Sequence, residues 1–234
     1  MTRYRVGMRV AALYDIHGNV PALRAALADG TASGVDAIVV GGDVVEGPQP
    51  AETLQLLDAV EIPLIWVRGN CDRAPSEWVI QHLDERRVEW LKALPQTQAL
   101  DIDGLGSVCF CHGSPQSDED IVTAVSDVER IAPMLEGVQE LTVVSGHTHV
   151  QFDRTVAGRR LVNAGSIGMP YQGVSGCAFW SVFGPDVEHR NSPFDAAEFA
   201  AILRSSGYPH HEWFEAESPE TAAAEYEQMA RDQA

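Results

Sequence analysis

The amino-acid sequence predicts an α/β domain built in layers, with helices at its C-terminal end. Short apolar runs rich in β-branched residues alternate with segments of helical periodicity through the first two-thirds of the chain. This alternation is typical of βαβ units. With 234 residues, of which 45% are hydrophobic and 21% charged, the chain is long and apolar enough for one large domain with a sizeable core.

Five apolar runs are expected to be strands, and they are residues 9–14, 37–40, 63–67, 107–111 and 141–144. Between them, residues 21–28 and 51–59 carry Ala, Leu and Val at helical spacing. After residue 150 the pattern changes to strand-like pieces separated by Gly turns, at 151–156, 160–163 and 177–183. These three pieces suggest a second, more antiparallel sheet.

Two helices are expected in the C-terminal part of the chain. The Ser-Pro pair at 192–193 reads as an N-cap and a first helical residue, Gly207 as a stop, and the Ser-Pro pair at 218–219 as a second start. Residues 186–234 carry eleven acidic residues against three arginines. We therefore expect a main domain over residues 1–190 and an acidic helical extension over 191–234 packed on it, with an interaction tail as the alternative.

The overall charge limits the classes of partner. Thirty-four acidic residues against 16 basic ones give a net charge of -18, which disfavours extended nucleic acids and anionic membranes. The chain shows no apolar run of membrane-spanning length and no secretory apolar stretch near its start. Its four cysteines are too few and too irregularly spaced for a disulfide framework. These features predict a cytoplasmic protein, and they leave its oligomeric state open.

Polar residues follow each of the five predicted strands. Because ligands of α/β sheets bind beyond the carboxyl ends of the strands, we expect seven side chains to meet there. They are Asp15, His17, Asp43, Asn70, His112, His147 and His149. First-row transition metals favour imidazole and carboxylate ligands, and seven ligands exceed what one tetrahedral zinc uses. Two metal ions that share a bridging carboxylate fit this set better.

The same residues resemble the motifs of the calcineurin-like metallophosphoesterase family. The motifs are Asp15-x-His17, Gly42-Asp43, Gly69-Asn70, His112 and Gly146-His147-x-His149, and the Asn-Ala-Gly-Ser sequence at 163–166 looks like their continuation. The resemblance extends to about residue 183 and implies a four-layer αββα sandwich with a dinuclear metal centre between the sheets. It assigns Asp15, His17, Asp43 and His149 to one metal. Asp43 bridges to the second, which also takes Asn70, His112 and His147.

The resemblance implies a dinuclear-metal-dependent phosphoester hydrolase, and most directly a phosphodiesterase that uses a metal-activated hydroxide on a small phosphoester substrate. Two divalent transition-metal ions are expected, with Mn²⁺ favoured over Fe, Zn or Ni. One alternative is a phosphomonoesterase that acts on nucleotides or phosphoproteins. Another is a non-catalytic interaction scaffold, which the completeness of the seven ligand positions disfavours.

Several residues beside the motifs are open to two interpretations. Cys71, which stands where many family members carry His, is either catalytic or a small packing residue, and similar Asn-Cys-Asp sequences occur in a subgroup of small phosphodiesterase-like members. Asp72 either orients a metal ligand or water, or caps a helix that begins near residue 75. Arg73 and Asn19 are candidates for phosphate contacts, as is Asn70; the alternatives are a surface charge for Arg73 and a helix N-cap for Asn19.

Overall fold

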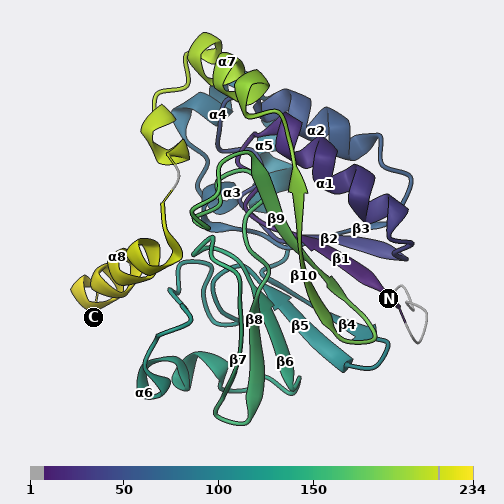
Figure 1. Cartoon of the computed structure of the whole chain (residues 1–234), viewed down its shortest axis with the longest axis vertical. Coiled ribbons are helices and arrows are strands. Elements are labelled where there is room, and N and C mark those ends of the chain that lie inside the picture. The colour runs from purple at the N-terminus through teal and green to yellow at the C-terminus, as the bar shows by residue number, and fades with distance from the viewer. Residues whose placement is uncertain (1–7, 216, 234) are drawn as a thin grey trace.

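Two five-stranded sheets stacked face to face form the centre of the computed structural model, which describes residues 8–215 and 217–233 (Figure 1). The first sheet has the order β10 (Val187–Pro193), β9 (Cys177–Phe183), β1 (Val10–Leu13), β2 (Ala37–Val40), β3 (Leu64–Trp66). The second has the order β4 (Thr97–Ile102), β5 (Gly106–Cys111), β6 (Thr142–Ser145), β8 (Arg159–Asn163), β7 (Phe152–Val156). The three central strands of the second sheet are parallel, as are β1, β2 and β3 of the first.

Helices cover the outer faces of both sheets, except for α8 (Pro219–Asp232), which lies beside the sheet ends. Those of the N-terminal half are α1 (Val20–Ala32), α2 (Pro50–Asp58), α3 (Asn70–Arg73), α4 (Glu77–His82) and α5 (Glu85–Lys92). Those that follow are α6 (Val128–Ile131), η1 (Pro133–Leu135), α7 (Ala196–Ser206), η2 (His211–Phe214) and α8 (Pro219–Asp232). Within the described residues, none of these helices has the length and apolar character needed to cross a membrane.

The alternation of side chains along β1 divides the core between two layers. Val10 and Ala12 pack between the two sheets, while Ala11 and Leu13 pack on the other face with α1. A third apolar cluster, which includes Cys109, lies between the second sheet and the α6–η1 segment. Successive strand residues point to opposite faces, so apolar residues on both faces of a strand require a layer on each side. The expected αββα sandwich is confirmed, with a thin fourth layer made of short helices.

The five expected strands and both expected N-terminal helices are present, but two details of the prediction are wrong. The strand-like pieces after residue 150 do not form a sheet of their own: β7 and β8 complete the second sheet, whereas β9 and β10 extend the first. The Ser-Pro pair at 192–193 lies in β10, and α7 begins later, capped by Asp195. The reason is tertiary packing, because Ser192 is buried and accepts a hydrogen bond from Trp180 Nε1 at 2.9 Å.

The remaining end signals of the C-terminal helices agree with the sequence. Gly207 ends α7 in a left-handed conformation, and the Ser218 hydroxyl caps α8 by accepting from Thr221 N. Since β10 pairs with β9 as far as Pro193, the helical part of the C-terminal region begins only at Ala196. Figure 1 shows α7 over the helical layer of the first sheet and α8 at the left, beside the sheet ends.

Candidate metal centre

The polar segments that follow the strands of both sheets converge at one edge of the sandwich. The Asp15 segment after β1 hydrogen bonds to the Asp43 segment after β2, through His17 N to Asp43 O at 3.0 Å. It also reaches the other sheet, because His147 N donates to Asp15 Oδ2 at 2.9 Å. His112, at the end of β5, places its Nδ1 2.9 Å from the Gly41 carbonyl. These bonds fix the ends of four strands relative to one another.

Six of the seven predicted ligands form two clusters suited to metal ions. One consists of Asp15, His17 and His149, and the other of Asp43, His112 and His147, each with one possible ligand atom per residue within 4.8 Å of the others. Asp43 joins the two, because its Oδ2 lies 3.4 Å from His112 Nε2 and 3.9 Å from His17 Nε2. The seventh, Asn70, places Oδ1 3.1 Å from His112 Nε2. The division into two sets matches the one the resemblance implies.

Backbone carbonyls orient three of the imidazoles. His17, His112 and His149 each direct Nδ1 at a backbone carbonyl, that of Glu46 at 3.0 Å, of Gly41 at 2.9 Å and of Met169 at 2.8 Å respectively. A proton on Nδ1 leaves Nε2 as a ligand atom, as is usual for metal-binding histidines. The sequence alone could not identify these carbonyl partners, because every residue type carries one.

The geometry at the centre fits bound cations. His17 Nε2 lies 3.3 Å from His149 Nε2, and His149 Nε2 lies 3.2 Å from Asp15 Oδ1. Asp15 is fully buried, yet its Oδ1 has no hydrogen-bond partner among the described residues. Buried acceptors that face one another without protons between them repel, and a divalent cation satisfies them together. The donor set of imidazoles, carboxylates and one amide therefore suits two transition-metal ions.

Five of the candidate ligands lie on left-handed backbone. Asp15, His17, Asp43, His147 and His149 have φ between 46° and 63°, and Ala157 is the one other non-glycine residue with positive φ in the described part of the chain. Such conformations cost about 1–3 kcal/mol each for side chains of this kind and gather at functional sites. Local strain thus coincides with the residues that the motifs select.

Burial and neighbouring charges shift the pKa values of His147 and His112 in opposite directions. Burial lowers the pKa of His147 to about 4, and the neighbouring His112 contributes to this. Burial also opposes the charged form of His112, but the Asp43 and Asp15 carboxylates outweigh it and raise the pKa of His112 to about 10. In the metal-free chain His112 therefore carries a proton that a metal ion must displace, so metal binding releases protons.

Comparison with known proteins shows which family the domain that carries these ligands belongs to. The calcineurin-like phosphoesterase superfamily domain matches residues 8–182, which hold all seven predicted ligands. The chain belongs to the calcineurin-like phosphoesterase superfamily. This confirms the family resemblance and the class of a metal-dependent phosphoester hydrolase, and the scaffold alternative is not favoured.

Individual proteins are similar to this chain over most of its length. Phosphodiesterase YfcE from Escherichia coli K12 is 27% identical over 175 residues, which are 71% of this chain and 83% of that protein. A metallophosphoesterase structure from Sphaerobacter thermophilus has a TM-score of 0.70 and 24% identity, covering 94% of this chain and 99% of its own. The hypothetical protein PH1004 from Pyrococcus horikoshii has a TM-score of 0.73 and 19% identity, covering 88% and 96%. The two structures show a shared fold.

Asp72 lies behind the metal centre and holds backbone in place. Its buried carboxylate accepts hydrogen bonds from the N–H groups of Asp43 at 2.8 Å, Val44 at 3.1 Å and Gly69 at 2.9 Å. The Gly69 contact also closes the first turn of α3. The helix that begins near residue 75 is α4, and Ser76 caps it instead of Asp72. Burial and the Asp43 carboxylate raise the pKa of Asp72 to about 6.

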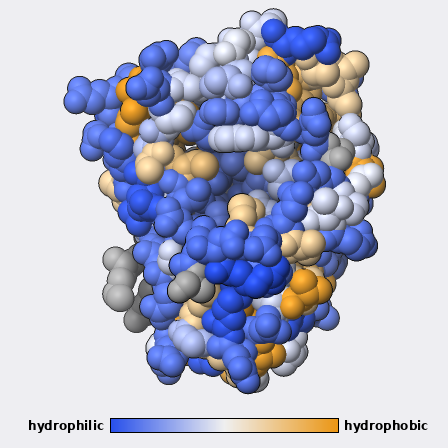
Figure 2. Space-filling model, turned by 90° about the vertical axis from the view of Figure 1, so that its left-hand side faces the viewer, coloured by the Kyte–Doolittle hydropathy of each residue, from blue (hydrophilic) through white to orange (hydrophobic). Residues whose placement is uncertain are grey.

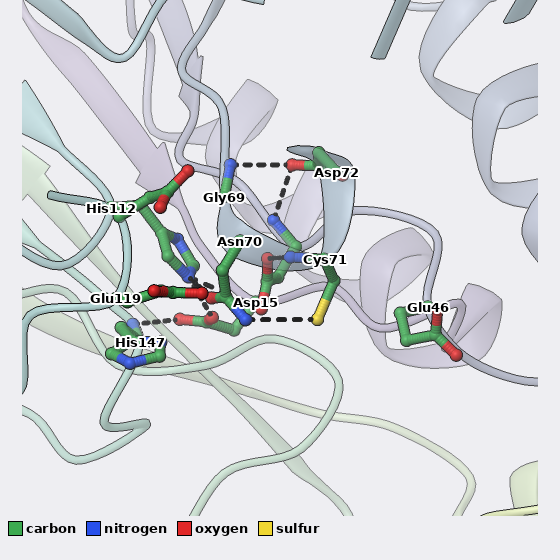
Figure 3. Close-up of polar contacts among 12 residues, drawn as sticks. Asp15, Glu46, Gly69, Asn70, Cys71, Asp72, His112, Glu119 and His147 are labelled. Atoms are coloured by element: carbon green, nitrogen blue, oxygen red, sulfur yellow. Dashed lines mark hydrogen bonds and ion pairs between the residues drawn. The ribbon is translucent and has the colours of Figure 1, made fainter. Parts of the chain in front are cut away.

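Cys71 lies beside Asn70 in α3. Its backbone N–H donates to Asp43 Oδ1 at 2.9 Å, and its sulfur lies 3.6 Å from the Asn70 side-chain nitrogen. Figure 3 shows Asn70 close to His112, with the Cys71 sulfur on the side toward Glu46. Burial and the Asp43 carboxylate raise the pKa of the thiol well above its usual value, so the metal-free chain keeps it neutral.

Arg73 and Asn19 have partners within the protein. Arg73 pairs with Asp118 at 3.0 Å and with Glu119 at 2.7 Å. The Asn19 side chain accepts from Ala22 N as the N-cap of α1, and its nitrogen donates to the Gly168 carbonyl. Both placements agree with the alternatives to phosphate contact, a paired surface charge and a helix cap.

Two further groups of residues contact the candidate metal ligands or the backbone beside them, and the sequence assigned neither group a role. Asn163 donates to Gly146 O and Thr148 Oγ1, and Ser166 donates to the Asp15 carbonyl at 2.8 Å. Their signal was the Asn-Ala-Gly-Ser sequence. Tyr171 and Tyr226 lie against the ligands themselves: Tyr171 stacks on His149 at 5.0 Å, and the Tyr226 hydroxyl donates to His147 O at 3.1 Å. No motif pointed to either tyrosine.

Proposed function

We propose that this protein is a phosphodiesterase with a dinuclear metal centre. The observation that carries the proposal is the pair of His/Asp clusters joined through the Asp43 carboxylate. Asp15, His17 and His149 hold one ion, and His112 and His147 hold the other together with the Asn70 amide oxygen. Mn²⁺ is the proposed metal, with Fe, Zn or Ni as alternatives that this mixed nitrogen and oxygen donor set also suits.

When bound at these residues, two cations would supply a lowered pKa for water and neutralisation of charge on phosphoryl oxygens. The chain's part is to hold the ligands at fixed positions. Backbone carbonyls orient three imidazoles, and the Asp72 carboxylate fixes the Asp43 backbone, which we propose as its positioning role. Asn70 contacts the substrate as well as one ion. For Cys71 we propose a place at the substrate side of α3, with a minor effect on rate.

A diester substrate is favoured over a monoester by the likeness to a phosphodiesterase. The net charge of -18 favours a small phosphoester over an extended nucleic acid. The four unpaired cysteines suit the reducing cytoplasm, where we place the enzyme. A phosphomonoesterase remains the second candidate, because the metal cluster itself does not select between one and two substituents on phosphorus.

The proposal is tested by reconstituting the purified protein with Mn²⁺ and assaying bis-p-nitrophenyl phosphate beside p-nitrophenyl phosphate. We expect faster turnover of the diester. Asp43→Asn should lower kcat/KM by about a thousandfold or more, since losing a bridging carboxylate removes several kcal/mol of charge stabilisation. Cys71→Ala should stay within about tenfold of the wild type. Wild-type turnover in Asp43→Asn contradicts the mechanism, and a preference for the monoester supports the second candidate.

A further inference from the structure

An aromatic pair lies beside the metal centre and comes from two distant parts of the chain. Tyr171 belongs to the loop after β8, and Tyr226 belongs to α8. Their ring centroids are 6.4 Å apart, within the range of interacting aromatic pairs. Each also contacts a candidate ligand, since Tyr171 stacks on His149 and the Tyr226 ring lies 6.2 Å from that of His147. The pair therefore borders both metal clusters.

The position of Tyr226 is fixed by the attachment of α8 to the domain. One oxygen of Glu227 accepts from Arg130 and from Thr123 Oγ1, both at 2.8 Å, and from Ser126 Oγ. At the start of α8, Gly173 N donates to Glu217 O at 2.7 Å, which joins this segment to the loop that carries Tyr171. Two separate attachments thus hold the tyrosines in a defined relation.

The surroundings of the pair restrict what can bind there. Both tyrosines are partly exposed, so part of each side chain is accessible to a ligand. The carboxylates of Glu217, just before α8, and of Glu225, next to Tyr226 in the sequence, lie near the pair, so negative charge borders it. Figure 2 shows a central hollow with mainly hydrophilic surroundings on the side of the molecule where α8 lies. A second anionic group is disfavoured in such a neighbourhood, whereas an uncharged ring can stack.

We propose that Tyr171 and Tyr226 form a binding surface for an uncharged, planar aromatic substituent of the phosphoester. With the phosphoryl group at the metal ions, a substituent that extends past His147 and His149 meets the two rings. The C-terminal helix is then a determinant of substrate selectivity. This inference rests on the proposed phosphoesterase function.

Binding of substrate analogues tests the surface directly. Phenylphosphonate and methylphosphonate share the charged group and differ in the ring, so their Kd values are compared by calorimetry on the Mn²⁺-loaded full chain at a pH where both are dianions. We expect phenylphosphonate to bind about three- to tenfold more tightly, which corresponds to about 0.6–1.4 kcal/mol and to one aromatic contact. The ratio of the methylphosphonate Kd to the phenylphosphonate Kd should keep its value in Tyr226→Phe, which retains the ring. In Tyr226→Leu the ratio should fall toward one.

Met229→Ala is the matched control, because Met229 is exposed on the same helix and should leave the preference unchanged. Equal Kd values in the wild type, or a preference that survives in both Tyr226→Leu and Tyr171→Leu, overturn the inference. If Tyr226→Leu does not fold, Tyr171→Leu and Tyr226→Phe still supply the comparison.

A kinetic comparison separates this inference from the proposed function. Phenyl p-nitrophenyl phosphate and methyl p-nitrophenyl phosphate have the same leaving group, so the ratio of their kcat/KM values reports on the other substituent. We expect a three- to tenfold preference for the phenyl ester in the wild type, lost in Tyr226→Leu. Hydrolysis of neither ester contradicts the proposed function, whereas equal hydrolysis of both contradicts only the aromatic surface.

Discussion

Asp72 shows how a single carboxylate supports the centre without facing it. It accepts three backbone hydrogen bonds, including that of Asp43, in a fully buried position. Removal of a buried acceptor leaves its donors unpaired, at about 1–3 kcal/mol each. The backbone that carries the bridging ligand is thereby tied to the first turn of α3.

Asp72→Ala is predicted to lower the free energy of unfolding by at least about 3 kcal/mol, because three buried N–H groups lose their acceptor. Urea denaturation of the metal-free protein measures this change. Asp101→Ala, at an exposed position on β4, serves as the control and should change stability by less than about 0.5 kcal/mol. Equal stability of the two variants would show that the Asp72 bonds contribute little.

The candidate ligands could be predicted from the sequence because their order follows the strand ends. Asp15 and His112 come directly after apolar runs, and Asp43 follows another after two glycines. Their orienting partners could not be predicted, because those partners are backbone carbonyls such as that of Met169, whose position depends on the fold. The role of Tyr226 on α8 could not be predicted either, because this residue is distant from the ligands in sequence and belongs to no motif.

At the scale of the elements, the turn after β2 depends on a glycine. Gly42 has a φ of 99°, and a Cβ there would lie 2.6 Å from Gly69 N and 2.7 Å from His112 Nδ1. A side chain at this position is strained and would displace one of the imidazoles.

Gly42→Ala is therefore predicted to weaken metal binding by at least tenfold, as measured by calorimetric titration with Mn²⁺. Gly137→Ala is the matched control, since Gly137 also has a positive φ, of 81°, but nothing lies within 4 Å of the added Cβ. Backbone strain alone affects both variants, so a similar loss of metal affinity in the two would mean that displacement of His112 is not the cause.

The two Ser-Pro pairs show that a local sequence signal for the start of a helix can be wrong. Ser218-Pro219 begins α8 as its sequence suggests, whereas the same pair at 192–193 lies in a strand. The difference comes from tertiary packing, because Ser192 is buried between Trp180 and α1, where its hydroxyl also donates to Asp29 at 2.6 Å. Strands β4 and β10 were missed because their solvent-facing positions are polar and they form no continuous apolar run.

The attachment of α8 is predicted to depend on Glu227. Glu227→Ala removes the acceptor shared by Thr123, Ser126 and Arg130, so the helix should detach more often and become cleavable. Limited proteolysis followed by mass spectrometry should show faster cleavage before α8 than in Met229→Ala, the control on the same helix. Unchanged cleavage would mean that other contacts hold the helix.

For the molecule as a whole, bound metal ions change the balance of charge at the sheet ends. Only Asp15 and Asp43 among the seven proposed ligands are anionic, so two divalent ions leave the centre locally positive within a chain of net charge -18. Global acidity disfavours a long polyanion, whereas the local field favours one small phosphoester.

Metal removal is predicted to lower thermal stability. Five strained ligands and facing acceptors favour unfolding in the metal-free chain, and an ion at a hundred times its Kd stabilises by about 2.7 kcal/mol. For a chain of this size, two ions should raise Tm by about 10–20 °C. Calorimetry of the Mn²⁺-loaded protein with and without chelator measures the shift. An unchanged Tm would mean that the clusters do not bind metal tightly.

Anomalous diffraction from crystals of the Mn²⁺-loaded protein tests whether two metal ions share the Asp43 carboxylate. We expect two manganese peaks about 3.5–4 Å apart, one among Asp15, His17 and His149 and the other among His112, His147 and Asn70, with Asp43 in contact with both. A single peak, or manganese bound elsewhere on the acidic surface, would contradict this arrangement.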